Sequence, residues 1–544
     1  MAARQEVSLS RARSETSVEE LDALVIGAGV TGLYQLYCLR QLGVNARIYE
    51  AGEGVGGTWY WNRYPGARLD SESWSYAYSF SDELLQEWEW TESFVGQPEL
   101  ERYLNHVADK FELRPHIRLA ARVKSAIFDE AANHWDVETE DGHRARAQFV
   151  IAATGLLSAN HLPDIPGIES FEGEAFHTSR WPHEPVDFRG KRVGVIGTGS
   201  TGVQVIPQVA RECAHLTVFQ RTPNYCCPLR NSPIDAEWQK EIKANYREIF
   251  AKCKQNTGGF IHEPDPRSTL DVTPEEREAF YEDIWGKPGF AKWFGNFRDL
   301  MTNRQANEFY CEFVRKKIRE RVNDPEIAEK LCPKDHHYGA KRIPLETDYY
   351  ETYNRDNVLL VDVREDPIER ITPTGLTTKN ATHELDVLIY ATGFDAFIGE
   401  VTRMDVRGVG GQTIQARWAE GPSMYMGLQT AGFPNLFFEN GAVFCNFTRC
   451  AEAAAEFVGG CIGYMRDNGF ERVEARQEAE TAWIEHARSF SAARIISEGV
   501  TNWADGSNIP GKPVALAFYG GGFKAYTDYC DEVAAKGYEG FELS

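Results

Sequence analysis

The chain has 544 residues and a formal net charge of −23, with 42% hydrophobic and 26% charged residues. Its length corresponds to roughly three to four domains of about 150 residues each. The composition is that of an ordinary globular protein. The acidic excess argues against binding to nucleic acid or to an anionic membrane surface, because both require a cationic face.

The sequence contains no apolar stretch near the roughly 20 residues that a membrane-spanning helix requires. Residues 1–20 are polar and charged rather than signal-like, so we expect a loose tail and a soluble cytoplasmic protein. The 11 cysteines show no metal-ligand spacing, and Cys445 and Cys450 are five residues apart with no matching pair of histidines. We expect no metal site, and reduced thiols with structural roles.

A dinucleotide-binding motif lies near the start of the chain. A buried-strand pattern at 23–26 precedes Gly27-Ala28-Gly29-Val30-Thr31-Gly32, and a helical stretch follows through Leu42. This is the glycine fingerprint in the context it requires, between a strand and a helix N-terminus. The next strand pattern, at 46–50, ends in Glu50, whose carboxylate can accept hydrogen bonds from ribose hydroxyls. The motif predicts a site for FAD or NAD.

A second copy of the motif follows 170 residues later, as Gly197-Thr198-Gly199-Ser200-Thr201-Gly202 between a strand pattern at 193–196 and a helix. In this copy Glu50 is replaced by Gln220, and Arg221 follows it. A carboxylate would repel a 2′-phosphate, whereas a neutral residue beside an arginine accommodates one. The second copy therefore favours NADP. The alternative for Arg221 is a solvated surface side chain.

The pattern of strands and helices predicts an α/β fold with two Rossmann-like domains, one for FAD and one for NADP, and a helical insertion in the NADP domain. Strand patterns ending in Ala-Thr-Gly at 149–155 and 387–393 are interpreted as the points where the chain leaves and re-enters the first domain. Apolar stripes within 238–250 and 309–322 predict helices that face a core. Two nucleotide folds in one chain imply electron transfer between cofactors. The expected segments are a tail at 1–20, FAD-binding domain at 21–155 and 389–544 (the latter with the C-terminal active-site segment), NADP-binding domain at 156–228 and 335–388, and insertion at 229–334.

A glycine-rich segment loaded with aromatic residues, 54–66, follows the first nucleotide fold. Disulfide reductases with two nucleotide folds carry a cysteine pair at about this point, where this chain has Trp59 and Tyr60. Dithiol chemistry is therefore excluded there. The spacing of Cys445 and Cys450 is similar to that pair, but it lies in the C-terminal part of the chain, and we do not predict a redox centre from it.

The segment Phe171-x-Gly173-x-x-x-His177-x-x-x-Trp181-Pro182, just before the second glycine motif, resembles the fingerprint of the Baeyer-Villiger monooxygenases. Both glycine motifs, both Ala-Thr-Gly segments, residues 59–66 and residues 508–513 also match, so the resemblance covers the chain after residue 20. It implies FAD and NADPH as cofactors, molecular oxygen as co-substrate, and oxidation of ketones to esters or lactones.

The resemblance also implies roles for particular residues. Arg342 stands at the place of the family's catalytic arginine, which would stabilise an anionic flavin C4a-peroxide, because a guanidinium stays charged. Asp70 matches the aspartate that holds this arginine, Lys341 would lie near the NADP phosphate, and Trp503 would close over the nicotinamide. The alternatives are an ordinary interdomain salt bridge for Asp70 and Arg342, and core packing for Trp503. The residues expected to contact the two cofactors are Gly27, Gly29, Gly32, Glu50, Gly57, Thr58, Trp59, Tyr60, Trp61, Arg68, Asp70, Tyr76, Val123, Gly197, Thr198, Gly199, Ser200, Thr201, Gly202, Gln220, Arg221, Thr222, Lys341, Arg342, Phe447 and Trp503.

Two features limit what the resemblance implies. His177 is interpreted as a hinge or hydrogen-bonding element between domains rather than as a general base. Residues 440–448 are shorter and more aromatic than the pocket loop usual in relatives, so the preferred ketone is left open.

The competing functions are a flavin-dependent N- or S-oxygenase, an uncoupled NADPH oxidase and a nucleotide sensor without turnover. We expect a monomer or a weak homo-oligomer.

Overall fold

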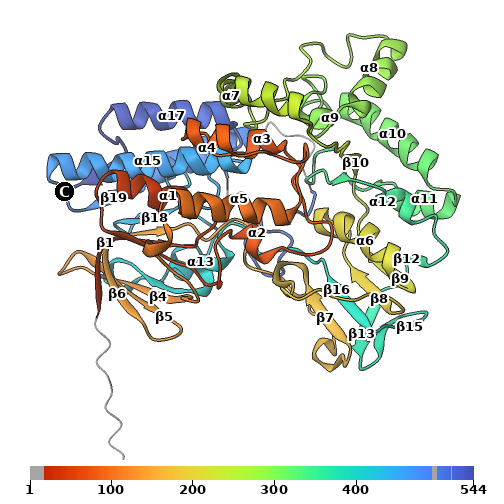
Figure 1. The fold of residues 1–544 in the computed structure, drawn as a ribbon, viewed down its shortest axis with the longest axis horizontal. Coiled ribbons are helices and arrows are strands. Elements are labelled where there is room, and N and C mark those ends of the chain that lie inside the picture. The colour runs from red at the N-terminus through yellow and green to blue at the C-terminus, as the bar shows by residue number, and fades with distance from the viewer. Residues whose placement is uncertain (1–17, 493–498, 516–517) are drawn as a thin grey trace, which may run out of the picture.

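Two sheets organise the chain in the computed structural model, which describes residues 18–492, 499–515 and 518–544 (Figure 1). In the larger sheet β1 (Glu19–Ile26) lies between β2 (Ala46–Tyr49) and β6 (Arg144–Ala152), and both pairings are parallel. A sheet covered on both faces needs continuously apolar strands, and Ala23 to Ile26 are all buried. The strand order is β17 (Asp405–Arg407), β4 (Val123–Asp129), β5 (His134–Thr139), β6, β1, β2 and β3 (Ile117–Arg118), and β18 (Leu436–Phe438) also pairs with β6.

Helices α1 (Val30–Gln41) and α15 (Phe447–Asn468) run side by side over one face of this sheet (Figure 1). Glycines on α15 allow the two helices to approach closely. A Cβ atom on Gly459 would lie 3.4 Å from Cβ of Cys38, and one on Gly463 would lie 3.4 Å from Leu42. Because α1 is held between the sheet and α15, most of its residues are buried. Helix α17 (Phe523–Ala535) packs beside α15.

The second sheet carries the second glycine motif and is parallel throughout. The fingerprint contributes its edge strand, β7 (Glu174–His177), and helix α6 (Ser200–Glu212) follows β8 (Arg192–Ile196). We expected the NADP domain to end at 388, but β16 continues to Tyr390 within this sheet, so that boundary cuts the strand. The strand order is β12 (Val358–Asp362), β9 (His215–Gln220), β8 (Arg192–Ile196), β16 (Val387–Tyr390) and β7 (Glu174–His177).

The residues between β9 and β12 contain the helices of the insertion, drawn in green at the upper right of Figure 1. The four longer helices have N-termini capped by side chains, for example by Asp235 on α7 (Ala236–Gln255) and by a capping box at Thr273 on α8 (Pro274–Gly286). The predicted apolar stripes face the core, and Ile242, Val314 and Ile318 are 3%, 0% and 0% exposed. The helices are α7 (Ala236–Gln255), α8 (Pro274–Gly286), α9 (Ala291–Phe294), α10 (Arg304–Arg321) and α11 (Pro325–Leu331).

Shorter elements complete the structure. Among the described residues, no helix has both the length and the apolar character needed to cross a membrane. The remaining helices are α2 (Thr58–Trp61), α3 (Ser73–Tyr76), α4 (Asp82–Glu87), α5 (Gln97–Lys110), α12 (Tyr349–Thr352), α13 (Gly399–Arg403), α14 (Ile414–Arg417) and α16 (Gln477–Ala492). The remaining strands are β10 (Cys227–Pro228), β11 (Leu345–Glu346), β13 (Ile368–Thr372), β14 (Gly375–Thr378), β15 (Thr382–Glu384), β19 (Val473–Ala475) and β20 (Phe541–Leu543).

Candidate active site

The two glycine turns have the same geometry. Gly27 has φ of 107° and Gly197 has φ of 108°, a region that favours glycine. A Cβ atom would lie 2.5 Å from the Ala153 carbonyl oxygen at Gly27, and 2.4 Å from that of Ala391 at Gly197. Strands β6 and β16 end just before these alanines, so the two Ala-Thr-Gly segments run directly past the turns. Each turn therefore requires glycine for the same two reasons.

The following helices begin where a pyrophosphate can bind. In the described structure neither α1 nor α6 has a side-chain cap at its N-terminus, so its first backbone N–H groups are free to receive an anion. A Cβ atom on Gly199 would have no described atom within 4 Å, which leaves open space over α6. At α1 a Cβ atom on the corresponding Gly29 would lie 3.4 Å from the Cα of Gly57. Both turns fit a dinucleotide.

The carboxylate of Glu50 is held rigidly at the end of β2. Its oxygens accept hydrogen bonds from the backbone N–H groups of Ala28 at 2.6 Å and Gly52 at 2.7 Å. Burial raises the pKa of Glu50, and these hydrogen bonds oppose that effect. The acceptor expected from the sequence is thus fixed beside the first glycine turn.

At the end of β9, which corresponds to the end of β2 in the first sheet, positively charged side chains lie where the first sheet has the carboxylate of Glu50. Gln220 is buried and donates to the Lys330 carbonyl at 2.8 Å, while Arg221 is exposed. Burial lowers the pKa of Lys341, and the positive charge of Arg221 lowers it further. Two cations from distant parts of the sequence therefore lie close enough to repel each other. Beside them, the Thr198 hydroxyl donates to the Thr222 carbonyl at 3.1 Å.

Arg342 lies where the three parts of the structure meet. Its Nη1 donates to Oδ2 of Asp70 at 2.5 Å and lies 3.5 Å from the Ser200 hydroxyl at the start of α6. Phe290, from the insertion, places its ring centroid 5.3 Å from Cζ of Arg342. The family resemblance predicted that Asp70 holds Arg342 and placed Ser200 among the cofactor contacts, but Phe290 was missed because no motif surrounds it.

Asp70 is 8% exposed, and its second oxygen, Oδ1, is buried without a hydrogen-bond partner among the described residues. Burial raises the pKa of Asp70, while the charge of Arg342 and its hydrogen bond lower it. A buried carboxylate oxygen without a partner is costly. The unpartnered oxygen beside Arg342 indicates that a bound group completes the site.

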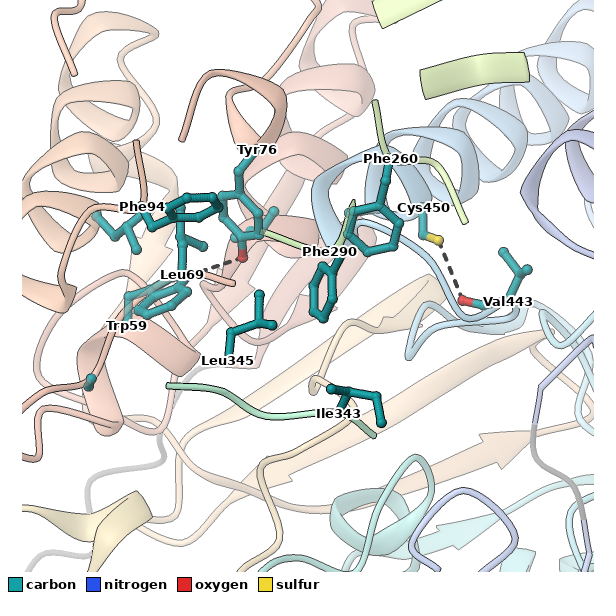
Figure 2. Packing of buried hydrophobic residues seen from close by; sticks show 14 of the residues in the cluster. Trp59, Leu69, Tyr76, Phe94, Phe260, Phe290, Ile343, Leu345, Val443 and Cys450 are labelled. Atoms are coloured by element: carbon teal, nitrogen blue, oxygen red, sulfur yellow. Dashed lines mark hydrogen bonds between the residues drawn. The ribbon is translucent and has the colours of Figure 1, made fainter. Parts of the chain in front are cut away.

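The aromatic segment after the first fold forms a packed platform. The Trp59 indole donates to the Tyr76 hydroxyl at 3.1 Å, and both side chains are buried (Figure 2). The Tyr60 hydroxyl accepts from the backbone of Glu53 at 3.1 Å. The guanidinium of Arg180 lies 4.4 Å from the ring centroid of Trp61. Arg180 was not singled out from the sequence, although it lies inside the fingerprint between His177 and Trp181.

The other expected cofactor residues are placed as follows. Gly57 has φ of 54° and precedes the exposed Thr58 at the start of α2. Arg68 is half-buried, 3.4 Å from Glu92. Val123 is buried at the start of β4, Phe447 is half-buried at the start of α15, and Thr201 is half-buried in the first turn of α6. Gly32 and Gly202 touch the carbonyls of Gly27 and Gly197, so a Cβ atom there would lie 1.9 and 2.2 Å from these oxygens.

Trp503 is separated from the Arg342 contacts. It is half-buried, and its ring stacks on Phe397 with centroids 5.8 Å apart. The segment that carries it nevertheless reaches the second nucleotide fold, since Lys341 donates a hydrogen bond to the Thr501 carbonyl. A contact of Trp503 with nicotinamide stays a prediction.

His177 is buried at the end of β7, with Nδ1 2.8 Å from the Ser179 hydroxyl. Burial, with a further contribution from Arg180, lowers the pKa of His177 to about 4. The imidazole is therefore uncharged near neutral pH. The role of His177 as a hinge or hydrogen-bonding element between domains stays a prediction.

We expect acidification from pH 6.5 toward pH 4 to destabilise the fold through His177. In this range the unfolded chain, with an ordinary histidine pKa, binds a proton that the folded chain does not, so stability falls as the pH falls. The contribution is at most about 3 kcal/mol. Urea unfolding at pH 7.5 and pH 5 checks this, and His177→Gln should show a smaller loss than the unaltered chain. Equal losses in both proteins would contradict it.

Cys445 and Cys450 are joined by a disulfide, so the prediction of reduced thiols is wrong for this pair. The first turn of α15 brings the Cα of Cys450 back to 6.3 Å from that of Cys445, within the range that a disulfide spans. The other nine cysteines of the described chain are free thiols. The spacing alone could not distinguish this turn from an extended loop.

Comparison with known proteins agrees with this geometry. Residues 22–229 match the family model FMO-like, Flavin-binding monooxygenase-like. The chain is 48% identical to 2-oxo-Delta(3)-4,5,5-trimethylcyclopentenylacetyl-CoA monooxygenase of Pseudomonas putida over 96% of this chain and 98% of the relative. It is 43% identical to acetone monooxygenase (methyl acetate-forming) of Gordonia sp. (strain TY-5), over 97% and 100%.

Two further likenesses bear on the chemistry. The crystal structure of OTEMO in complex with FAD and NADP superposes with a TM-score of 0.93 at 47% identity, covering 97% of this chain and 100% of that chain. Phenazine N-monooxygenase PhzNO1 of Lysobacter antibioticus is 41% identical over 96% of this chain and 97% of the relative. Proteins named for oxygenation of a ketone and of a phenazine nitrogen therefore both occur at this level of similarity.

Proposed function

Since this chain belongs to the family of Baeyer-Villiger monooxygenases, we propose that it uses FAD, NADPH and molecular oxygen to oxidise ketones to esters or lactones. The observation that carries the proposal is the position of Arg342, which contacts Asp70 from the first nucleotide fold, Ser200 from the second and Phe290 from the insertion. A fixed cation at that junction is placed to act on a substrate held between two cofactors.

The residues of the two turns would hold the cofactors. The uncapped N-terminus of α1 would bind the FAD pyrophosphate, with Glu50 accepting from ribose hydroxyls. The N-terminus of α6 would bind the NADP pyrophosphate, and Arg221 and Lys341 would pair with the 2′-phosphate. When bound, the flavin supplies the chemistry that takes hydride from NADPH and passes electrons to oxygen.

Arg342 would stabilise negative charge on oxygen atoms at the reacting centre. A guanidinium remains protonated at any pH at which the fold survives, so it supplies charge and hydrogen bonds without donating its proton. Asp70 holds Nη1 and leaves the other guanidinium nitrogens able to turn toward substrate. The Phe290 ring lies against the guanidinium, and this cation–π contact helps to fix the position of the charge.

Oxygenation of a ring or amine nitrogen is the second candidate, because one relative is named as a phenazine N-monooxygenase. That reaction needs an electrophilic oxygen, for which a proton donor rather than a permanent cation is suited. The Arg342 and Asp70 pair therefore favours the ketone reaction. Both candidates share the same cofactor sites.

Aerobic turnover of the purified flavoprotein with cyclic, aryl and long-chain ketones tests the proposal. We expect NADPH consumption to match formation of an ester or lactone one oxygen atom heavier than the ketone. A phenazine and an aryl amine in the same panel test the second candidate. Hydrogen peroxide in place of any oxygenated product across the panel would overturn both and leave an NADPH oxidase.

The surroundings in which the enzyme acts are also part of the proposal. We infer that it works in the cytoplasm as a monomer or weak homo-oligomer. Nine unpaired cysteines in the described chain support a reducing compartment. Light scattering of the purified protein and fractionation of the cells that produce it test the two statements separately.

A further inference from the structure

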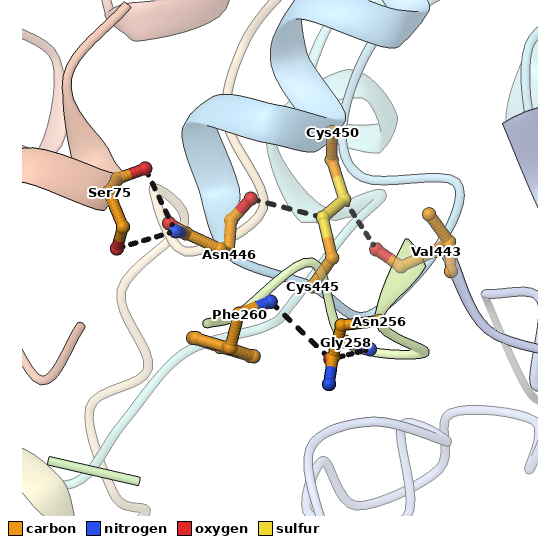
Figure 3. Close-up of a disulfide and its surroundings, with 8 residues drawn as sticks. All are labelled: Ser75, Asn256, Gly258, Phe260, Val443, Cys445, Asn446 and Cys450. Carbon is orange, nitrogen blue, oxygen red and sulfur yellow. Dashed lines mark hydrogen bonds between the residues drawn. A yellow bond between two sulfur atoms is a disulfide. The ribbon is translucent and has the colours of Figure 1, made fainter. Parts of the chain in front are cut away.

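The Cys445–Cys450 disulfide links the end of the segment after β18 to the first turn of α15 (Figure 3). Cys450 is 7% exposed and Cys445 is half-buried, whereas eight of the nine free cysteines are buried away from solvent. Cys445 lies within the aromatic segment 440–448, which departs from the usual pocket loop, and Cys450 follows two residues after its end.

The bridged segment contacts two other parts of the molecule. The Asn446 amide donates to the backbone carbonyl of Ser75 at 3.1 Å and to its hydroxyl at 3.2 Å, in the segment that carries Tyr76 (Figure 3). The backbone N–H of Asn446 donates to the Gly258 carbonyl of the insertion at 2.8 Å. A Cβ atom on Gly259 would lie 3.4 Å from that of Cys445. The bridge therefore restrains a junction between the flavin fold and the insertion.

The same junction leads to Arg342 through packed rings. Phe260, two residues after Gly258, lies with its ring centroid 5.2 Å from that of Phe290 (Figure 2), the ring that covers Arg342. On the other side of Cys445, Phe444 lies 5.9 Å from Trp293 of α9. Trp293 in turn contacts Phe290, with ring centroids 5.9 Å apart, so a change in the bridge can alter the position of the ring that lies against Arg342.

We propose that Cys445 and Cys450 form a redox site at which hydrogen peroxide converts a dithiol into the disulfide. One thiol attacks the peroxide, which breaks the O–O bond, gives a sulfenic acid and releases one water. The second thiol attacks the sulfenic sulfur and releases a second water. The two sulfurs lose two electrons in total, and the peroxide gains them. The inference rests on the proposed function, because uncoupled turnover of such an oxygenase generates the peroxide.

The disulfide restrains residues 445–450, at the end of the expected pocket loop. Cross-linking removes conformations from residues 445–450, so Asn446 keeps its hydrogen bonds to Ser75 and Gly258. Reduction releases this restraint without removing any group that contacts Arg342. The oxidised enzyme is therefore the form that binds ketone more tightly and releases less hydrogen peroxide for each NADPH that it consumes.

Alkylation under denaturing conditions measures the redox site directly. The protein reduced with dithiothreitol and desalted should take up 11 alkyl groups, and the same protein treated with hydrogen peroxide should take up nine, the two lost mapping to Cys445 and Cys450. Cys445→Ser should show no peroxide-dependent disulfide. Cys38→Ser, which alters the half-buried free thiol on α1, is the matched control and should still form the bridge. An unchanged count after peroxide, or loss of thiols elsewhere, would overturn the proposal.

Steady-state kinetics test the consequence. We expect reduction to raise the KM for ketone and the hydrogen peroxide released per NADPH by several-fold, while the rate of flavin reduction by NADPH stays the same. Cys445→Ser should behave like the reduced enzyme in either condition. Identical kinetics in the oxidised, reduced and substituted forms would refute the pocket restraint. Absence of any oxygenated product would instead reject the proposed function, and the thiol count remains readable in that case.

Discussion

Arg342→Ala is expected to abolish formation of ester or lactone while FAD stays bound and NADPH still reduces it. The expected loss of product formation is at least about 100-fold, the scale found when one donor that stabilises an oxyanion is removed. Anaerobic flavin bleaching by NADPH measures reduction, and product mass under oxygen measures oxygenation. Hydrogen peroxide should account for the NADPH that is consumed.

Two controls separate the charge of Arg342 from its effect on the fold. Arg364→Ala removes an arginine from the same part of the chain, where it pairs with Asp362 at 2.9 Å, and should leave oxygenation unchanged. Arg342→Lys keeps a charge but loses the planar group that contacts Asp70 and Phe290 together, so it should recover little product. Loss of flavin reduction in Arg342→Ala would show that the residue serves NADPH binding instead.

The nucleotide folds could be predicted from the sequence because their signals are local. Each glycine turn combines a strand, a positive φ and a close backbone approach within about ten residues, and only glycine meets these demands. Gly27 and Gly197 satisfied them with nearly the same φ and the same carbonyl contact. Glu50 and Gln220 could also be picked out, because each stands at the end of the next strand after its glycine turn.

The active site was accessible only through the family resemblance. Asp70 and Arg342 are 272 residues apart, and no periodicity or spacing connects them. Phe290 lies between short helices of the insertion, where an exposed and a buried phenylalanine look alike in sequence. Its contact with Arg342 depends on how the whole insertion packs on the two nucleotide folds.

The disulfide was mispredicted for a different reason. Whether Cys445 and Cys450 can meet depends on where helix α15 begins. Had the helix begun before Cys445, the two side chains would have been more than one turn apart on its surface. Helix starts are among the least certain features of a sequence, and Asn446 provides no side-chain cap that would have marked this one.

Arg221→Ala is expected to remove the preference for NADPH over NADH. Arg221 and Lys341 lie near each other in the structure, and a 2′-phosphate placed between them would relieve their mutual repulsion. A charge-assisted hydrogen bond is worth about 1.5–3 kcal/mol, so the KM for NADPH should rise roughly 10- to 100-fold. The KM for NADH, which has no 2′-phosphate, should change little. Initial rates of flavin reduction with each nucleotide provide the measurement.

Arg211→Ala is the matched control, because Arg211 is an exposed arginine on α6 that pairs with Asp348 at 2.6 Å and lies outside the expected phosphate site. It should leave both KM values unchanged. Gln220→Glu extends the test in the opposite direction: it restores the carboxylate that Glu50 supplies in the first fold, which repels a phosphate and accepts from ribose hydroxyls. This variant should lower the KM for NADH as it raises that for NADPH. Equal rises for both nucleotides in Arg221→Ala would mean that Arg221 maintains the fold of the site rather than recognising the phosphate.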